Sequence, residues 1–149
     1  MYFFTTVKDG KLPTKGTKHS ACIDFYARED CEVASGKVSF VPLGIKINQE
    51  GIKMLMGSGF EDFMDRHYIS LKPRSGIRAK GIISHSGVID LDYPDEIRMI
   101  LTIVSGEGSY LIRKGDKVAQ ALLLEHKTSL FGISSDVERT GGFGSTGER

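Results

Sequence analysis

Two aspartates and a tyrosine lie close together in the segment GVIDLDYPDE, residues 87–96. Asp90 and Asp92 are two positions apart and share a face if the strand is regular, whereas Tyr93 points the other way. The Pro-Asp pair that follows signals a turn, and a bend there would bring the tyrosine ring beside Asp90. An ionised carboxylate can take a proton from water, so Asp90 is a candidate general base. For an isolated DxD before a turn, a merely solubilising strand end is the favoured alternative.

Two further segments carry groups that can hold phosphate. In PRSGIRAKGI, residues 73–82, a turn punctuated by Pro and Gly76 projects Arg74 and Ser75 and forms a plausible anion nest, although the arginine could equally be a solvated surface charge. Gln120 lies in the apolar run of RKGDKVAQALLL. A buried amide without partners costs roughly 1 to 3 kcal/mol, so either the protein or a ligand must satisfy it.

The C-terminal segment RTGGFGSTGER is rich in Gly, Ser and Thr. Its GFGSTG fits GxGxxG but lacks the βαβ context of a dinucleotide site. Glycine N–H groups and the hydroxyls of Ser145 and Thr146 can approach phosphate, Arg139 can bind it with two parallel bonds, and Phe143 offers a face to a base. A mobile arm closing over a nucleotide would have this composition, and so would a disordered tail.

Metal-ligating patterns are weak in this sequence. Asp24, in the alternating segment ACIDFYA, could orient an arginine or a hydrated cation. Cys22 and Cys31 form no CxxC, and the four histidines form no HxxxH pair. We therefore expect two free thiols in a reducing compartment and no metal site built by the protein alone.

Short apolar and β-branched runs separated by glycine-containing turns must position these groups, and they predict strands. Many short strands with almost no helix indicate an all-β barrel or jelly roll. The runs cover residues 2–7, 22–27, 38–47, 69–72, 81–89, 96–104, 110–112 and 118–124.

One stretch has helical spacing. Phe60, Phe63, Met64 and His67 fall at i, i+3, i+4 and i+7, which predicts a short amphipathic helix, the only one expected. We expect its apolar stripe to cover part of the β core, with a partner surface as the alternative.

Composition bounds the class of protein. The 149 residues are 40% hydrophobic and 26% charged, as expected for one soluble domain. A net charge of +1 without blocks of like charge argues against a nucleic-acid or membrane surface. The start MYFFTTVKDG has no basic leader, and no apolar run approaches membrane-spanning length, which predicts a cytoplasmic protein.

Taken in order, ACIDFYA, PRSG, GVIDLDY, GDKVAQALL and GGFGSTG resemble the five motifs of the trimeric dUTPase family and span residues 21–147. The resemblance implies a distorted β-barrel or jelly roll that forms a homotrimer with active sites shared between chains. It implies a barrel domain over residues 1–137, with an insertion near 48–69, and a flexible arm over residues 138–149 that closes over an active site. The implied reaction converts dUTP to dUMP and pyrophosphate, which limits uracil incorporation into DNA and supplies dUMP for thymidylate synthesis.

The resemblance also implies roles for individual residues. Asp90 would align a water for in-line attack on the α-phosphorus, and Tyr93 would stack under the deoxyribose and exclude a 2′-hydroxyl. Asp24 would organise Mg²⁺ through water, with the ion held mainly by the substrate's phosphates, because Mg²⁺ keeps several waters and oxygen ligands. The remaining substrate-binding residues implied are Arg74, Ser75, Gly76, Gly87, Gln120, Arg139, Phe143, Gly144, Ser145 and Thr146.

The sequence departs from the family pattern at three places. Cys22 replaces the usual Gly of the first motif, Pro94-Asp95 follow Tyr93 where a polar residue and Gly are common, and the spacing from Arg139 to Phe143 is one residue shorter. The segment before Pro73 is also longer than in compact members, and this insertion could offer a partner surface.

Two alternative functions remain open at this point. A dCTP deaminase shares the fold and parts of the motifs, although GVIDLDY and GGFGSTG favour diphosphate hydrolysis. A nucleotide-sensing regulatory trimer would use dUTP as a switch and the insertion as its contact surface.

Overall fold

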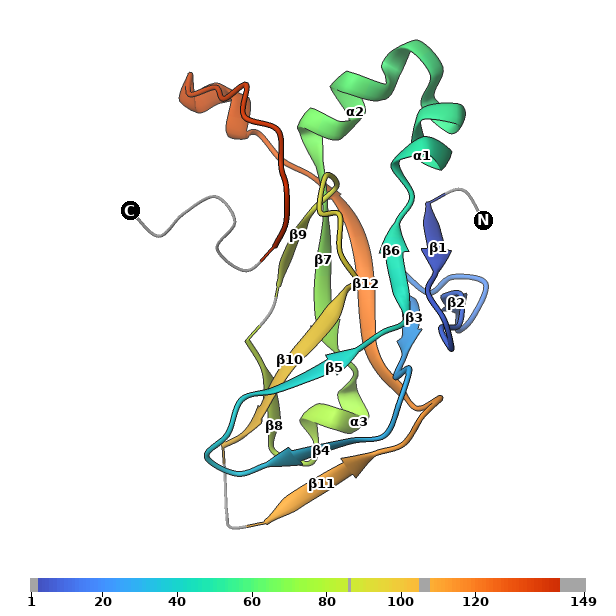
Figure 1. The fold of residues 1–149 in the computed structure, drawn as a ribbon, viewed down its shortest axis with the longest axis vertical. Helices are drawn as coiled ribbons and strands as arrows, with labels where there is room; N and C mark the ends of the chain where they lie inside the picture. The colour runs from blue at the N-terminus through green and yellow to red at the C-terminus, as the bar shows by residue number, and fades with distance from the viewer. Residues whose placement is uncertain (1–2, 86, 105–107, 143–149) are drawn as a thin grey trace.

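The computed structural model describes residues 3–85, 87–104 and 108–142, and this part of the chain is built mainly of short antiparallel strands (Figure 1). The architecture confirms the all-β prediction. The strands are β1 (Phe4–Thr6), β2 (Thr14–Lys15), β3 (Ile23–Tyr26), β4 (Cys31–Ala34), β5 (Ser39–Pro42), β6 (Ile45–Ile47), β7 (His67–Pro73), β8 (Ile82–Ser84), β9 (Val88–Asp90), β10 (Arg98–Ile103), β11 (Ser109–Ile112) and β12 (Lys117–Glu125).

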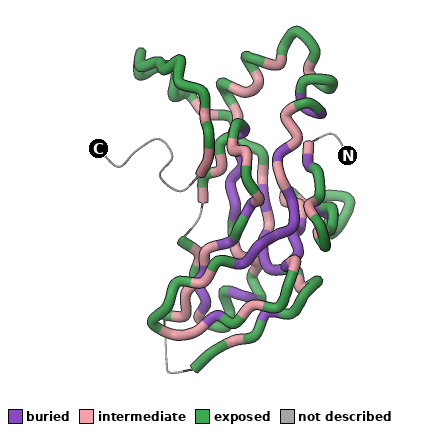
Figure 2. Tube along the Cα trace, in the orientation of Figure 1, coloured by how far each residue is buried: buried purple, intermediate pink, exposed green. Residues whose placement is uncertain are grey.

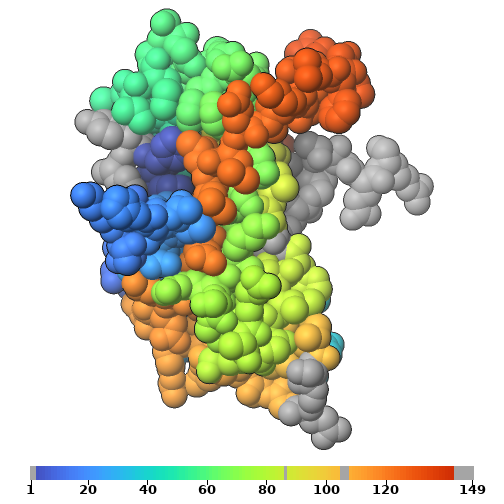
Figure 3. Space-filling view, turned by 180° about the vertical axis from the view of Figure 1, so that it is seen from behind, coloured from blue at the N-terminus to red at the C-terminus, as the bar shows by residue number. Residues whose placement is uncertain are grey.

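The largest sheet has the order β2-β3-β12-β7-β9, with β12 at its centre. β7 pairs along most of β12, from Ala119 opposite Pro73 to Glu125 opposite His67. Seen from behind, β12 runs between the N-terminal segments on one side and β7 with the short helix α3 (Ser75–Arg78) on the other (Figure 3). This sheet therefore brings the ends of β3, β7 and β12 together.

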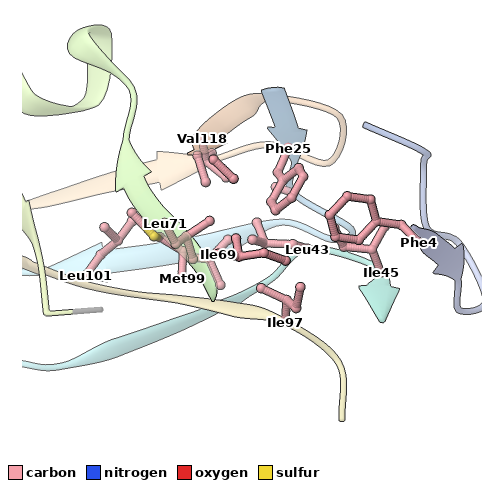
Figure 4. Packing of buried hydrophobic residues seen from close by; sticks show 14 of the residues in the cluster. Phe4, Phe25, Leu43, Ile45, Ile69, Leu71, Ile97, Met99, Leu101 and Val118 are labelled. Atoms are coloured by element: carbon pink, nitrogen blue, oxygen red, sulfur yellow. The ribbon is translucent and has the colours of Figure 1, made fainter. Parts of the chain in front are cut away.

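A second sheet, β5-β10-β8, and the pairs β1-β6 and β4-β11 complete the fold. Buried apolar side chains from both sheets meet in one cluster (Figure 4). The labelled members are Phe4, Phe25, Leu43, Ile45, Ile69, Leu71, Ile97, Met99, Leu101 and Val118. Removing this apolar surface from water stabilises the arrangement.

The predicted helix exists as α2 (Phe60–Arg66), and Phe60, Phe63 and Met64 pack against the core, as the stripe predicted. It is not the only helix, however, because α1 (Gln49–Met56) and the 3-10 turn η1 (Gly57–Gly59) precede it. The side chain of Asn48 caps α1 by accepting from the Gly51 N–H at 3.1 Å, and Ile52 anchors the helix in the core. Asn48 is a capping signal that the sequence shows, but Ile52 is the one large apolar side chain that α1 buries, so its buried side chains show no helical spacing.

The helical segment projects from one end of the sheets and is mostly exposed or half-buried (Figure 2). Its second helix ends at Arg66, and β7 begins directly after it at His67. None of the helices in the described ranges is long and apolar enough to span a membrane.

Several predicted strands differ in extent from the observed ones. The run 38–47 divides into β5 and β6 at Gly44, whose φ of 69° favours glycine, and the run 81–89 divides into β8 and β9. β2 and β4 were not predicted, because each is short and polar or mixed. The predicted buried strand 118–124 is buried only in its first half, since Leu123 and Leu124 are exposed.

Candidate active site

Asp90 and Tyr93 line one cavity of about 330 Å³, a volume within the range of small-ligand sites. Asp90 ends β9, opposite Tyr68 of β7, and its carbonyl accepts the Tyr93 N–H at 3.1 Å, which makes the predicted bend. The Asp90 side chain is 61% exposed, so water can reach its carboxylate. The other lining residues are His85, Gly87, Val88, Ile89, Ile97, Arg98, Ile100 and Arg139.

A carboxylate that the motif analysis did not assign anchors the turn carrying Tyr93. Glu96 accepts from Arg28 Nε and from the Gly44 N–H, each at 2.8 Å, and its second oxygen accepts from Arg28 Nη2 at 3.3 Å. Its side chain is largely buried. Charge-assisted bonds of this kind fix the turn to the loop between β5 and β6.

Arg139 lies over the candidate general base. Its Nη1 donates to Asp90 Oδ2 at 2.7 Å and to Asp92 Oδ1 at 3.1 Å, and its guanidinium carbon is 5.3 Å from the centroid of the Tyr93 ring. Burial works to lower the pKa of Arg139, but the hydrogen bonds to the two carboxylates outweigh it, and the pKa is raised above its ordinary value. Gly142 packs so closely on the Tyr93 ring that a side chain there would collide with it. Arg139 and Gly142 of the C-terminal segment therefore cover this cavity.

The phosphate-binding candidates gather at a second place, where β7 ends. Arg74 precedes α3 (Ser75–Arg78), so the segment read as a turn is a one-turn helix. Arg74 Nε lies 3.4 Å from Oδ1 of Asp24, and Lys117 Nζ lies 3.2 Å from its Oδ2. Gln120 Nε2 donates to the Pro73 carbonyl at 3.4 Å, so the protein itself satisfies this amide.

Two cavities flank Arg74. One, of about 450 Å³, is lined by Arg74, Ser75, Gly76, Ile77, Lys80, Tyr110, Asp116 and Lys117. The other, of about 490 Å³, is lined by Gly16, Thr17, Ser20, Ala21, Cys22, Asp24, Arg74, Lys117 and Gln120. Arginine, lysine and hydroxyl groups together suit a phosphate-bearing ligand.

The structure thus separates the predicted site residues into two groups. The nucleoside group comprises Gly87, Asp90, Tyr93 and Arg139, and the phosphate group comprises Asp24, Arg74, Ser75, Gly76 and Gln120. In the described part of the chain, no cavity given above is lined by members of both groups. The predicted residues Phe143, Gly144, Ser145 and Thr146 lie outside the described residues.

Two pKa values follow from burial at or near these sites. Burial raises the pKa of Tyr93, so its phenol stays neutral at physiological pH. Burial likewise raises the pKa of the Cys31 thiol, and Cys22 and Cys31 are both free, as predicted.

The sequence motifs did not single out Lys117 or Glu96. The sequence signal for Lys117 was its place three residues before Gln120.

The described part of the chain is a mainly antiparallel β protein with one cavity beside Asp90 and Tyr93 and two cavities beside Arg74. The family model described as dUTPase matches residues 62–147. The deoxyuridine 5′-triphosphate nucleotidohydrolases of Rickettsia felis and Rickettsia prowazekii are 33% and 31% identical over 147 residues, covering 93% of this chain and 89% of each relative. The chain belongs to the dUTPase family.

Solved structures of similar fold are also dUTPases. That of Streptococcus mutans superposes with a TM-score of 0.63 at 24% identity, covering 83% of this chain and 94% of that one. The dUTPase of phage phi11 of S. aureus gives 0.65 at 16% identity, covering 94% and 97%. These likenesses confirm the predicted jelly-roll-like fold.

Proposed function

We propose that this protein hydrolyses dUTP to dUMP and pyrophosphate. The observation that carries the proposal is the cavity that pairs the exposed carboxylate of Asp90 with the ring of Tyr93 in a member of the dUTPase family. The Asp90 carboxylate takes a proton from a water as the water oxygen bonds to the α-phosphorus. The bond from that phosphorus to the bridging oxygen breaks, and pyrophosphate leaves in line.

We infer that Arg139, which donates to Oδ2 of Asp90 at 2.7 Å, moves aside when substrate enters. A guanidinium released from two carboxylates can bind the phosphates of the incoming nucleotide with parallel bonds. Phe143, Ser145 and Thr146 would then close over the uracil and the γ-phosphate end, with Gly144 allowing close backbone approach. The short spacing between Arg139 and Phe143 makes this part the least similar to the family pattern.

The nucleoside would lie along Tyr93, with the ring against the deoxyribose and no space for a 2′-hydroxyl. Gly87 would let the backbone approach uracil. The neutral phenol of Tyr93 and an apolar wall of Val88, Ile97 and Ile100 suit a neutral base and sugar.

A complete site requires more than one copy of the chain. The nucleoside and phosphate groups line separate cavities, and we propose that a homotrimer joins the phosphate group of one subunit to the nucleoside group of another. Phe40 and Ile83 are 47% and 42% exposed on the outer face of β5-β10-β8, and Ile100 lies beside Phe40 in register. Such an apolar face next to the nucleoside cavity supports a subunit contact there.

Mg²⁺ fits the phosphate group. Among the described residues lining the cavity of Gln120, Asp24 is the only carboxylate, which suits an ion held mainly by substrate phosphates and touching the protein through water. The ion would neutralise the triphosphate charge. A mutant dUTPase from phage phi11 of S. aureus, described as revealing the coordination of a structural Mg(II) ion, has a similar fold.

In a cell this reaction would limit uracil incorporation into DNA and supply dUMP for thymidylate synthesis, in the cytoplasm. We also propose the helical insertion as a contact surface for a partner, because Met54 and Leu55 of α1 are 75% and 54% exposed.

The test is pyrophosphate release from dUTP, compared with dTTP, dCTP and UTP, with and without Mg²⁺. We expect release from dUTP alone, dependent on the metal. Ammonia release from dCTP would instead favour the deaminase alternative, and no reaction with any nucleotide would refute the proposal.

A further inference from the structure

Strand β12 has an irregularity at the phosphate group. Lys117 pairs with Tyr26 and Ala119 pairs with Phe25, so Val118 is an extra residue in β12. In a regular strand Lys117 and Gln120 would point to opposite faces, because they are three positions apart. Both nevertheless line the cavity that contains Asp24. The bulge therefore turns Lys117 onto the side of Gln120.

The bulge is also tied to the neighbouring phosphate-binding segment. The carbonyl of Val118 accepts the N–H of Arg74 at 3.2 Å, so the same irregularity fixes where Arg74 emerges from β7. Arg74 and Lys117 are the two described residues that line both cavities beside this turn. One distortion of the sheet thus sets the positions of two cations.

The charges around Asp24 are unequal. Its largely buried carboxylate meets the guanidinium of Arg74 and the ammonium of Lys117, which leaves one excess positive charge. The Asp116 carboxylate, which accepts the Arg113 backbone N–H at 2.9 Å, lines the cavity on the Ser75 side, where Lys80 supplies a further positive charge. Lys117 is 41% exposed, and its ammonium is a point charge on a flexible stem, so it can exchange a carboxylate for a phosphate without moving the backbone.

We propose that Lys117 is a phosphate ligand of this protein, a role that rests on the proposed dUTP hydrolysis. In the structure its ammonium neutralises Asp24, and on substrate entry it turns to the β- and γ-phosphates while Nε of Arg74 stays with Asp24 and leaves its Nη groups for phosphate. The α-phosphate belongs with Asp90 in the nucleoside group, so Lys117 acts on the two outer phosphates and not on the nucleoside.

The experiment compares Lys117→Met with Lys117→Arg and with a matched control, Lys11→Met. Lys11 is also a lysine beside the Tyr26 ring, at 3.9 Å from its centroid against 6.0 Å for Lys117, but it lines neither phosphate cavity. Calorimetric titration of each full-length variant with dUMP and with the α,β-imido analogue of dUTP, in Mg²⁺, separates the outer phosphates from the rest of the ligand.

Lys117→Met should weaken binding of the imido analogue about tenfold to a hundredfold, as expected for loss of a hydrogen bond between charged groups, and change dUMP binding less than about twofold. Lys117→Arg should restore part of the difference, and Lys11→Met should bind both ligands like wild type. Equal weakening of both ligands by Lys117→Met, or no weakening of the analogue, would overturn the role of Lys117. A wild-type protein that binds neither ligand would refute the proposed function itself.

Discussion

The nucleoside group and the phosphate group differ in what holds their functional side chains. Asp24 and Gln120 lie on the neighbouring strands β3 and β12, Arg74 directly follows β7 of the same sheet, and the Asp24 carboxylate is only 9% exposed. Asp90, in contrast, is 61% exposed at the end of a short strand, and its partner Arg139 comes from the C-terminal segment. The phosphate group is held by the sheet, whereas Asp90 in the nucleoside group is covered by its contact with Arg139.

This difference matches two chemical tasks. Binding a triphosphate requires fixed positive charge, which a sheet supplies without reorganisation. Activating a water requires a carboxylate that water can reach and that a closing segment later shields. Substitutions in the nucleoside group should therefore lower the reaction rate with little effect on stability, whereas substitutions in the phosphate group should also lower the stability of the fold.

The largest effect should come from Asp90→Asn. Loss of the general base should lower kcat by about 10² to 10⁴, with little change in melting temperature because the side chain is mostly exposed. Steady-state pyrophosphate release and thermal melting measure the two quantities. Asp95→Asn, an exposed change in the same loop, is the control, and a kcat within about threefold of wild type for Asp90→Asn would remove Asp90 from the chemistry.

Glu96→Ala should show that the turn carrying Tyr93 is held by contacts outside the cavity that Asp90 and Tyr93 line. Losing charge-assisted bonds to Arg28 and to the Gly44 N–H should cost about 1.5 to 3 kcal/mol of unfolding free energy and raise KM as Tyr93 loses its position. Urea unfolding and substrate titration report both effects. If KM stayed constant while stability fell, Glu96 would support only the fold.

Asp24→Asn should show a stability effect that Asp90→Asn lacks. It leaves Arg74 and Lys117 without their shared carboxylate, but both cations are partly exposed, so the cost should be about 1 to 2 kcal/mol. Denaturant unfolding with and without Mg²⁺ measures it. Equal stability of Asp24→Asn and wild type would mean that the phosphate group is not held by this buried carboxylate.

The smallest effect lies away from both groups, at Asp30. A backbone hydrogen bond from Lys114, reinforced by Arg113, lowers the pKa of Asp30. The carboxylate therefore stabilises the folded state above its unfolded pKa of about 3.9, and this contribution is lost as pH falls through the lower folded pKa. Wild type should melt slightly above Asp30→Asn at pH 7, and the two should converge under acid conditions. A difference that persists unchanged at the lowest pH would contradict this linkage.

The sequence predicted the elements whose signals are local. Short apolar and β-branched runs predicted most strands, and the spacing of Phe60, Phe63 and Met64 predicted α2. The Pro after Tyr93 predicted the bend beside Asp90. Each of these features depends on residues within about one turn or one strand, which is why pattern alone was sufficient.

Long-range contacts could not be predicted in this way. Arg139 meets Asp90 across 49 positions and Arg28 meets Glu96 across 68, and neither pair carries a local pattern. The bulge at Val118 depends on the register against β3, so the placement of Lys117 became visible only in the structure. Helix α1 was missed because one buried isoleucine gives no helical stripe.

We propose that the two groups act together only when different subunits supply them. Asp90→Asn and Arg74→Met proteins should each be inactive, and unfolding and refolding them together should give mixed trimers in which about a quarter of the sites have an intact Asp90 from one chain and an intact Arg74 from another. We predict that the refolded mixture releases pyrophosphate from dUTP at about that fraction of the wild-type rate. A mixture that assembles into trimers yet remains as inactive as either variant alone would contradict the account.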